Sequence, residues 1–348
     1  MKYSFISGKK RIVLAITICL LSAIKLCCQE KHNFKIVSYN VENYFDCVDD
    51  SLTDDQEYLP SGLRAWNTTK YKKKQTNIGK VICSIGGWET PALVGLCEVE
   101  SEKCLSDLTR YAGLKNLKYK FLHHESPDAR GVDVALLYQP YLFKPIHNEA
   151  IHINFPHYPE IKTRDILFAS GIVPSGDTLH VFVCHFPSRL GGELESEERR
   201  IFVASVLRSK VDSLFTFNNK PNIVIMGDFN DYPPNRSLSE TLRALPPKEP
   251  YLQNNLYNLM FPIHLKGKGS HKHNGEWGTL DQIIVSGNLL IPTNSIFTLP
   301  TDAHIFEAEF LLEEDRTFLG KQPFRTYVGM KYQGGFSDHL PVFVDLWY

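Results

Sequence analysis

The chain has 348 residues, of which 43% are hydrophobic and 22% are charged. This composition is typical of a globular protein and excludes a disordered or collagen-like chain. The formal net charge is −1, but residues 1–28 contain five basic side chains and no acidic one, so the rest carries 33 basic against 39 acidic residues, a net charge of −6. That balance excludes a protein surface that is strongly basic throughout and binds nucleic acid through counterion release.

The N-terminus has the pattern of an export signal. Lys9, Lys10 and Arg11 precede an apolar run over 12–24, which is too short for a bilayer-spanning helix of about 20 residues. A buried N-terminal helix is the weaker alternative, and Cys27 or Cys28 leaves a lipoprotein signal open. We therefore expect residues 1–28 to be a signal and residues 30–348 to be a single exported domain, which is periplasmic, attached to the outer surface as a lipoprotein, or secreted.

Five cysteines remain after this signal: Cys47, Cys83, Cys97, Cys104 and Cys184. An odd number without a CxxC pair indicates neither a disulfide framework nor a zinc site. Those at 97 and 184 lie in apolar runs and are expected to be buried thiols. One disulfide among the others stays open.

Runs of β-forming or apolar residues predict strands along the whole remaining chain. In chain order they cover residues 34–41, 92–97, 132–138, 166–173, 179–184, 223–226, 280–285 and 342–346. Apolar residues at helical spacing predict helices over 69–85 and 193–217. A lysine run at 70 and 72–74 is interpreted as a solvated helix face in preference to a phosphate contact.

The strands outnumber the helices, and no segment repeats or has low complexity. This pattern predicts the α+β class, as a four-layer α/β/β/α sandwich of two packed, mainly antiparallel sheets flanked by helices. The loops at 232–250 and 262–278 are long enough to face a substrate. His271 and Trp277 lie in the second loop, where a solvated His and a buried aromatic are the favoured interpretations. No second apolar run suits a membrane-spanning segment.

Polar side chains recur where the predicted strands begin or end. They are Asn40, Glu42, Glu98, His185, Asp228, Asn230, Asp281, Asp338 and His339. A buried carboxylate is costly without a partner, and a single Asp or Asn at such a place is usually a turn residue. Several from separated strands, if they share one edge, would supply the ligands and acid–base groups for a hard divalent cation and phosphate chemistry.

Four motifs in this order resemble the endonuclease/exonuclease/phosphatase superfamily, which has the deoxyribonuclease-I-like fold. They are SYNVEN at 38–43, CEVE at 97–100, GDFN at 227–230 and SDH at 337–339. The matches span residues 34 to 346. The VENYFD segment at 41–46 is similar to the corresponding segment of a secreted, nuclease-like bacterial branch of this superfamily.

The resemblance implies a metal site. Glu98 would be the main ligand, with Glu42 and Asp338 near the ion, directly or through water. The implied ion is Mg²⁺, with Mn²⁺ or Ca²⁺ as alternatives. Glu42 stands where several repair nucleases have Asp.

The resemblance also implies catalytic roles. Asp228 would orient or deprotonate the attacking water, and Asn40 and Asn230 would hydrogen-bond the scissile phosphate or orient ligands. His339 would donate to the phosphoryl group while Asp281 holds it protonated. A second catalytic histidine would be His185, and Arg189 is a candidate for substrate binding, with a surface ion pair as its alternative.

The favoured function is a divalent-metal-dependent phosphodiester hydrolase, an exported endonuclease acting on DNA or RNA as its nucleic-acid substrate. One alternative is a phosphoesterase acting on phospholipid head groups or inositol phosphates. A catalytically inactive surface binding protein is the third, and it is disfavoured because the site residues are all present. We expect a monomer, and no protein partner is implied.

Overall fold

The computed structural model describes residues 32–189 and 191–348. The predicted export signal at 1–28 lies outside the described residues. Residues from Phe34 to Tyr348 form one compact unit. The five cysteines at positions 47 to 184 are all free thiols. Within the described ranges, no helix has the length and apolar character needed to cross a membrane.

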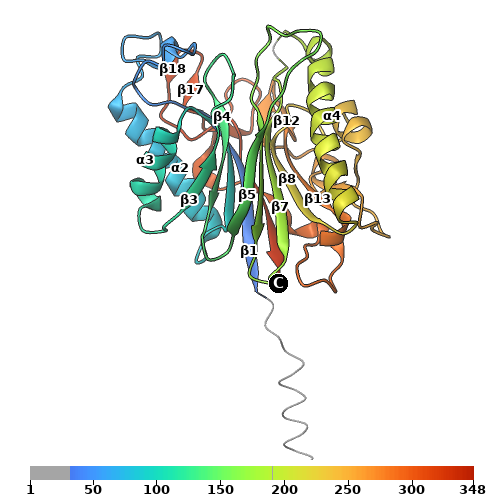
Figure 1. Ribbon diagram of the computed structural model, residues 1–348. Coiled ribbons are helices and arrows are strands. Elements are labelled where there is room, and N and C mark those ends of the chain that lie inside the picture. The colour runs from blue at the N-terminus through green and yellow to red at the C-terminus, as the bar shows by residue number, and fades with distance from the viewer. Residues whose placement is uncertain (1–31, 190) are drawn as a thin grey trace, which may run out of the picture. The chain divides into compact units, whose positions relative to one another are not determined.

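Two large sheets form the centre of this unit (Figure 1). The first has the order β14-β19-β1-β2-β4-β3 and consists of β1 (Asn33–Tyr44), β2 (Leu93–Val99), β3 (Lys120–His123), β4 (Asp133–Tyr138), β14 (Ala303–Ile305) and β19 (Val342–Trp347). The second has the order β5-β6-β7-β8-β13-β10-β9 and consists of β5 (Lys144–Ile151), β6 (Ile166–Ile172), β7 (Thr178–His185), β8 (Asn222–Asp228), β9 (Ala244–Leu245), β10 (Leu256–Asn258) and β13 (Asp281–Ser286). The pairs β1–β2, β7–β8 and β9–β10 are parallel, and most of the other neighbours are antiparallel.

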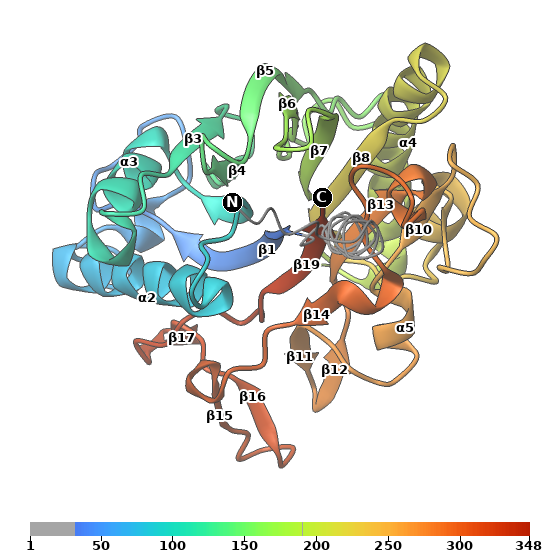
Figure 2. The ribbon, with the colours of Figure 1, turned by 90° about the horizontal axis from the view of Figure 1, so that it is seen from below.

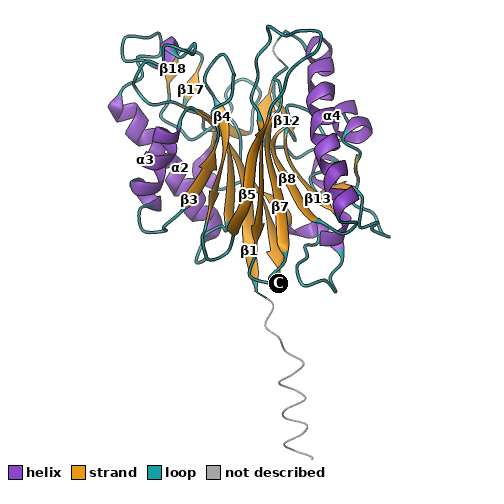
Figure 3. Ribbon diagram, in the orientation of Figure 1, coloured by secondary structure: helices purple, strands orange, loops and turns teal. Residues whose placement is uncertain are grey.

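The sheets pack face to face, with helices on their outer faces (Figure 3). Gly95 on β2 has no side chain, and a Cβ there would meet Met226 Cε of the other sheet at 2.8 Å, so the two sheets approach closely at this point. Helices α2 (Thr68–Gly86) and α3 (Glu102–Arg110) cover the first sheet, and α4 (Glu193–Phe217) covers the second. The predicted α/β/β/α sandwich is confirmed.

Local sequence explains the helix positions. The Asn67 side chain caps α2 by accepting hydrogen bonds from the amides of Thr69 and Lys70. Ile78, Val81, Ile82 and Ile85 lie on its buried face. The solvated interpretation of the lysine run is wrong for Lys74, which is 1% exposed. It lies four residues before Ile78 and therefore on the same apolar face.

The remaining elements are short and are attached to the sheets. The helix α5 (Phe261–His264) and the hairpin of β11 (His271–His273) and β12 (Glu276–Gly278) occupy the predicted loop at 262–278. Two further hairpins are formed by β15 (Leu312–Glu314) with β16 (Lys321–Pro323) and by β17 (Tyr327–Val328) with β18 (Lys331–Tyr332). Figure 2 shows β11, β12, β15 and β16 gathered on the β14 side of the first sheet. Single turns of 3₁₀ or π type are found at Gln56–Tyr58, Ala112–Leu114, Ser237–Thr241, Gly287–Leu290, Pro300–Asp302 and Glu309–Leu311.

Candidate active site

Strand register brings three of the predicted residues together. The β7–β8 ladder pairs His185 with Asp228, and the β8–β13 ladder pairs Asp228 with Asp281. Three neighbouring strands therefore place a histidine and two carboxylates side by side at one edge of the second sheet. In the first sheet, Asn40 pairs with Cys97, the residue before Glu98.

Asp228 is 2% exposed, and its Oδ2 faces three possible donors. The Nδ2 of Asn40 lies at 3.1 Å, and the Nε2 atoms of His185 and His339 each lie at 3.7 Å. The amide of Asn230 donates to Oδ1. Burial and the negative charge of Asp281 raise the pKa of Asp228 to about 7, although His339 and these hydrogen bonds act in the opposite direction. Asp228 can therefore take up a proton near neutral pH.

His339 is held by Asp281. Its Nδ1 lies 2.7 Å from Asp281 Oδ2, an oxygen that also accepts a hydrogen bond from Ser270 Oγ. Burial alone would lower the pKa of His339, but the negative charges of Asp281 and Asp228 outweigh it and raise the pKa well above 6.5. His339 is therefore an imidazolium at neutral pH, with Nε2 pointing toward Asp228.

The other two histidines at this edge are neutral. Burial and the charges of Arg164 and Arg130 keep the pKa of His185 well below 6.5. No group among the described residues forms a hydrogen bond with its buried Nδ1. The His271 ring lies 4.8 Å from the His339 ring, and burial with the His339 charge lowers the pKa of His271 to about 4. His271 is half-buried and packs against the His339 ring, so it is not the fully solvated loop histidine that the sequence favoured.

Glu98 extends from a strained backbone position. Its φ is +65°, and Glu42, Asn43 and Asn230 also have positive φ. Such conformations cost roughly 1–3 kcal/mol each and are typical of functional sites. The Glu98 carboxylate lies at this edge, where Oε2 accepts a hydrogen bond from the Asn43 amide and Oε1 lies 3.4 Å from Asn40 Nδ2.

Glu42 and Asp338 form a second group around Arg325. The Nε of Arg325 lies 3.0 Å from Glu42 Oε1, and its Nη2 lies 2.9 Å from Asp338 Oδ2. The other oxygen of Glu42 accepts from the Thr326 amide at 2.6 Å and lies 4.0 Å from Lys74 Nζ. Both oxygens of Glu42 therefore already have protein donors, an arrangement that the sequence did not indicate. Glu42 as a metal ligand stays a prediction.

Charge explains the protonation states around Arg325. Burial would raise the pKa of Asp338, but the positive charges of His339 and Arg325 lower it to about 2. Burial and the neighbouring Asp338 raise the pKa of Glu42. Burial lowers the pKa of Lys74 to about 8, although Glu42 opposes this.

The donor set fits a divalent cation at Glu98. This edge contains five carboxylates, at positions 42, 98, 228, 281 and 338, and three cationic side chains, those of Lys74, Arg325 and His339. The carboxylates at this edge therefore outnumber the cationic side chains that lie within 4 Å of them. Oxygen ligands suit Mg²⁺ or Ca²⁺. The atoms of His271, Asp338 and His339 also lie within 4.8 Å of one another, but an imidazolium has no lone pair for a metal.

Two other candidates have mainly structural contacts. The Nε of Arg189 donates to the Asn230 carbonyl at 2.7 Å, and its Nη1 lies 3.0 Å from Glu193. This matches the ion-pair alternative, and phosphate binding by Arg189 stays a prediction. The Nδ2 of Asn230 donates to the Phe186 carbonyl.

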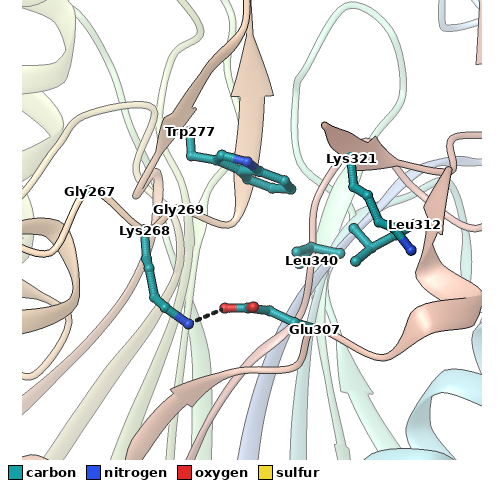
Figure 4. A pocket seen from close by; sticks show the side chains of 8 residues that line it. All are labelled: Gly267, Lys268, Gly269, Trp277, Glu307, Leu312, Lys321 and Leu340. Carbon is teal, nitrogen blue, oxygen red and sulfur yellow. Dashed lines mark hydrogen bonds and ion pairs between the residues drawn. The ribbon is translucent and has the colours of Figure 1, made fainter. Parts of the chain in front are cut away.

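A cavity of about 240 Å³ lies beside the β11–β12 hairpin (Figure 4). The Trp277 indole lies across it from an ion pair in which Lys268 Nζ and Glu307 Oε1 are 3.0 Å apart. Within the hairpin, Trp277 pairs with Lys272 and His271 pairs with Gly278. Side chains alternate between the two faces of a strand, so Trp277 and His271 point to opposite faces. The Trp277 cavity is therefore on the face of the hairpin away from His339.

Comparison with known proteins gives one family and a common fold. The model of the endonuclease/exonuclease/phosphatase family matches residues 35–347. No curated protein sequence matches the chain significantly. An endonuclease/exonuclease/phosphatase family protein from Bacteroides thetaiotaomicron has a TM-score of 0.55 at 13% identity, with 92% of this chain and 99% of that chain covered.

Two further structures show how widely function varies on this fold. A mannosyl-6-phosphatase from Bacteroides thetaiotaomicron VPI-5482 has a TM-score of 0.53 at 14% identity, with coverage of 90% and 99%. D. rerio TDP2 complexed with single-strand DNA product has a TM-score of 0.52 at 14% identity, with coverage of 90% and 98%. At these identities the likeness shows the fold alone.

The resemblance inferred from the four motifs is confirmed at the level of the family, and the narrower secreted branch stays a prediction. Because the family model covers nearly all of the described residues, the chain belongs to the endonuclease/exonuclease/phosphatase family, whose enzymes hydrolyse phosphoester bonds and generally use a divalent metal.

Proposed function

We propose that the protein is an exported, divalent-metal-dependent endonuclease that hydrolyses phosphodiester bonds of DNA or RNA. The observation that carries this proposal is the convergence of Asn40, His185 and His339 on one oxygen of Asp228, beside the Glu98 carboxylate. Intact-mass analysis of the cellular protein tests export, because a full-length, uncleaved chain would contradict it.

The proposed mechanism is hydrolysis in one step. A divalent ion, when bound, offsets the negative charge on phosphate oxygens and polarises water. Asp228 accepts a proton from the attacking water, and Asn40 holds the Asp228 carboxylate in place. As the new bond from water oxygen to phosphorus forms, the bond to the leaving oxygen breaks. The His339 imidazolium donates a hydrogen bond where negative charge develops. The leaving oxygen takes up a proton from solvent, and Asp228 afterwards releases to solvent the proton that it accepted.

The test is cleavage of supercoiled plasmid and of single-stranded RNA by residues 30–348 with added Mg²⁺, Mn²⁺ or Ca²⁺. We expect nicking of plasmid that EDTA abolishes, because without the ion the carboxylates at this edge would repel the phosphate. The Asp228→Asn variant, assayed at equal concentration, is the negative control. Nicking that persists in EDTA would contradict the metal requirement.

A phosphoesterase acting on a smaller substrate is the second candidate. It is favoured by the similar fold of a mannosyl-6-phosphatase. An inositol polyphosphate, a sugar phosphate and sphingomyelin should therefore be assayed in parallel. Metal-dependent release of phosphate or phosphocholine without plasmid nicking would replace the endonuclease proposal and leave the roles of Asp228 and His339 in place.

A further inference from the structure

Arg325 bridges two carboxylates that the family resemblance assigns to the metal. Its Nε and Nη2 lie 3.0 Å from Glu42 Oε1 and 2.9 Å from Asp338 Oδ2. A guanidinium holds two carboxylates in a fixed geometry through short, charge-assisted hydrogen bonds. Glu42 and Asp338 therefore already share one positive charge supplied by the chain itself.

Glu42 is also held independently of Arg325. Its Oε2 accepts a hydrogen bond from the Thr326 amide at 2.6 Å. On the same side, Lys74 Nζ lies at 4.0 Å and donates to Thr326 Oγ1 and to the Phe336 carbonyl. The Arg325 side chain, in contrast, is 40% exposed. Shortening Arg325 would therefore uncover the Glu42 and Asp338 oxygens without releasing Glu42 or opening the core.

Glu98 has a different environment. Its hydrogen-bond donors are the neutral amides of Asn43 and Asn40. In the described part of the chain, no Lys or Arg nitrogen lies within 4 Å of the Glu98 carboxylate, and the basic side chain that comes this close is His185. Glu98 is thus a carboxylate that no Lys or Arg approaches within 4 Å in the described residues, whereas Glu42 and Asp338 share the positive charge of Arg325.

We propose that Arg325 takes the place of a second divalent cation. One ion binds at Glu98, and the Arg325 guanidinium keeps another ion away from Glu42 and Asp338. A second ion would have to break two charge-assisted hydrogen bonds and displace a positive charge to reach this pair. Arg325 is then a positioning residue that sets the metal stoichiometry. This inference rests on the metal requirement of the proposed function.

The test is Mn²⁺ binding to residues 30–348, measured by isothermal titration calorimetry and by electron paramagnetic resonance of free Mn²⁺. We expect one ion per chain in the wild type and two in Arg325→Gln. Adding Glu42→Gln to that variant should return the number to one. Arg325→Lys, which retains the positive charge, should stay at one.

Arg64→Gln is the matched control. Arg64 lines the same cavity of about 170 Å³ as Arg325, but its side chain donates to Glu57 and to the Gly329 carbonyl. Removing its charge should leave one ion per chain. A gain of a second site in Arg64→Gln would show that the stoichiometry follows net charge and not the Arg325 bridge.

Two outcomes overturn the inference while leaving the metal requirement intact. They are two ions in the wild type, and a single ion in a folded Arg325→Gln variant. Glu42→Gln in the wild-type background provides a second measurement, because this variant should still bind one ion. If the variant lost that ion, Glu42 would be a ligand of the first site. A wild-type chain that binds no Mn²⁺ would contradict the metal requirement itself, so the two failures are distinguishable.

Discussion

Asp228→Asn is expected to lower kcat/KM for plasmid cleavage by a factor of about 10²–10⁴, the range that general acid–base groups contribute. Asparagine retains the size of the side chain but cannot accept the proton of the attacking water. The Asn40 amide and the two histidine Nε2 atoms would then face a neutral amide in place of a carboxylate. Initial rates at saturating metal, with Mn²⁺ stoichiometry as a second readout, check this result.

Asp231→Asn separates a loss of chemistry from a loss of stability. Asp231 lies three residues further along the chain and is also buried, but its Oδ1 lies 2.8 Å from Arg200 Nε. Removing one partner of a buried ion pair costs about 3–5 kcal/mol. We expect Asp231→Asn to lower Tm while the folded enzyme retains kcat. Equal losses of kcat in the two variants would contradict a chemical role for Asp228.

The sequence identified residues at strand boundaries because chain order and local pattern carry that information. It predicted the helix at 193–217 with the bounds that the structure has. It could not show that His185, Asp228 and Asp281 are adjacent, because this depends on pairing between strands far apart in the chain. Without the register of the strands, only the family resemblance predicts that these three residues belong to one site.

Lys74 and Arg325 were missed for different reasons. Lys74 lies in a lysine run, and the run hid its position on the apolar face that contains Ile78 and Ile85. That spacing is a signal that was present in the sequence. Arg325 lies between two very short strands, β16 and β17, where no periodicity exists to read. Its contacts with Glu42 and Asp338 arise from tertiary packing alone.

Asp281→Asn is expected to lower the pKa of His339 and to reduce the rate at neutral pH, because the imidazolium loses the negative charge that stabilises it. The alkaline limb of the pH–rate profile should therefore move to lower pH. Titration of His339 by NMR in EDTA checks the pKa directly. Ser270→Ala is the matched control, since it removes the other hydrogen bond to Asp281 Oδ2 but leaves the charge, and it should shift the pKa less.

Asp281→Asn also has a defined effect on the free energy of unfolding. A folded-state pKa above the unfolded value contributes stability that is fully present below the unfolded pKa of about 6.5 and is lost as the pH rises through the folded pKa. The free energy of unfolding should therefore fall more in Asp281→Asn at pH 6 than at a pH above the His339 titration. Denaturant unfolding at the two pH values measures this difference. An equal loss at both would mean that Asp281 stabilises the fold through its hydrogen bonds and not through the charge on His339, and the imidazolium would then have no place in the mechanism.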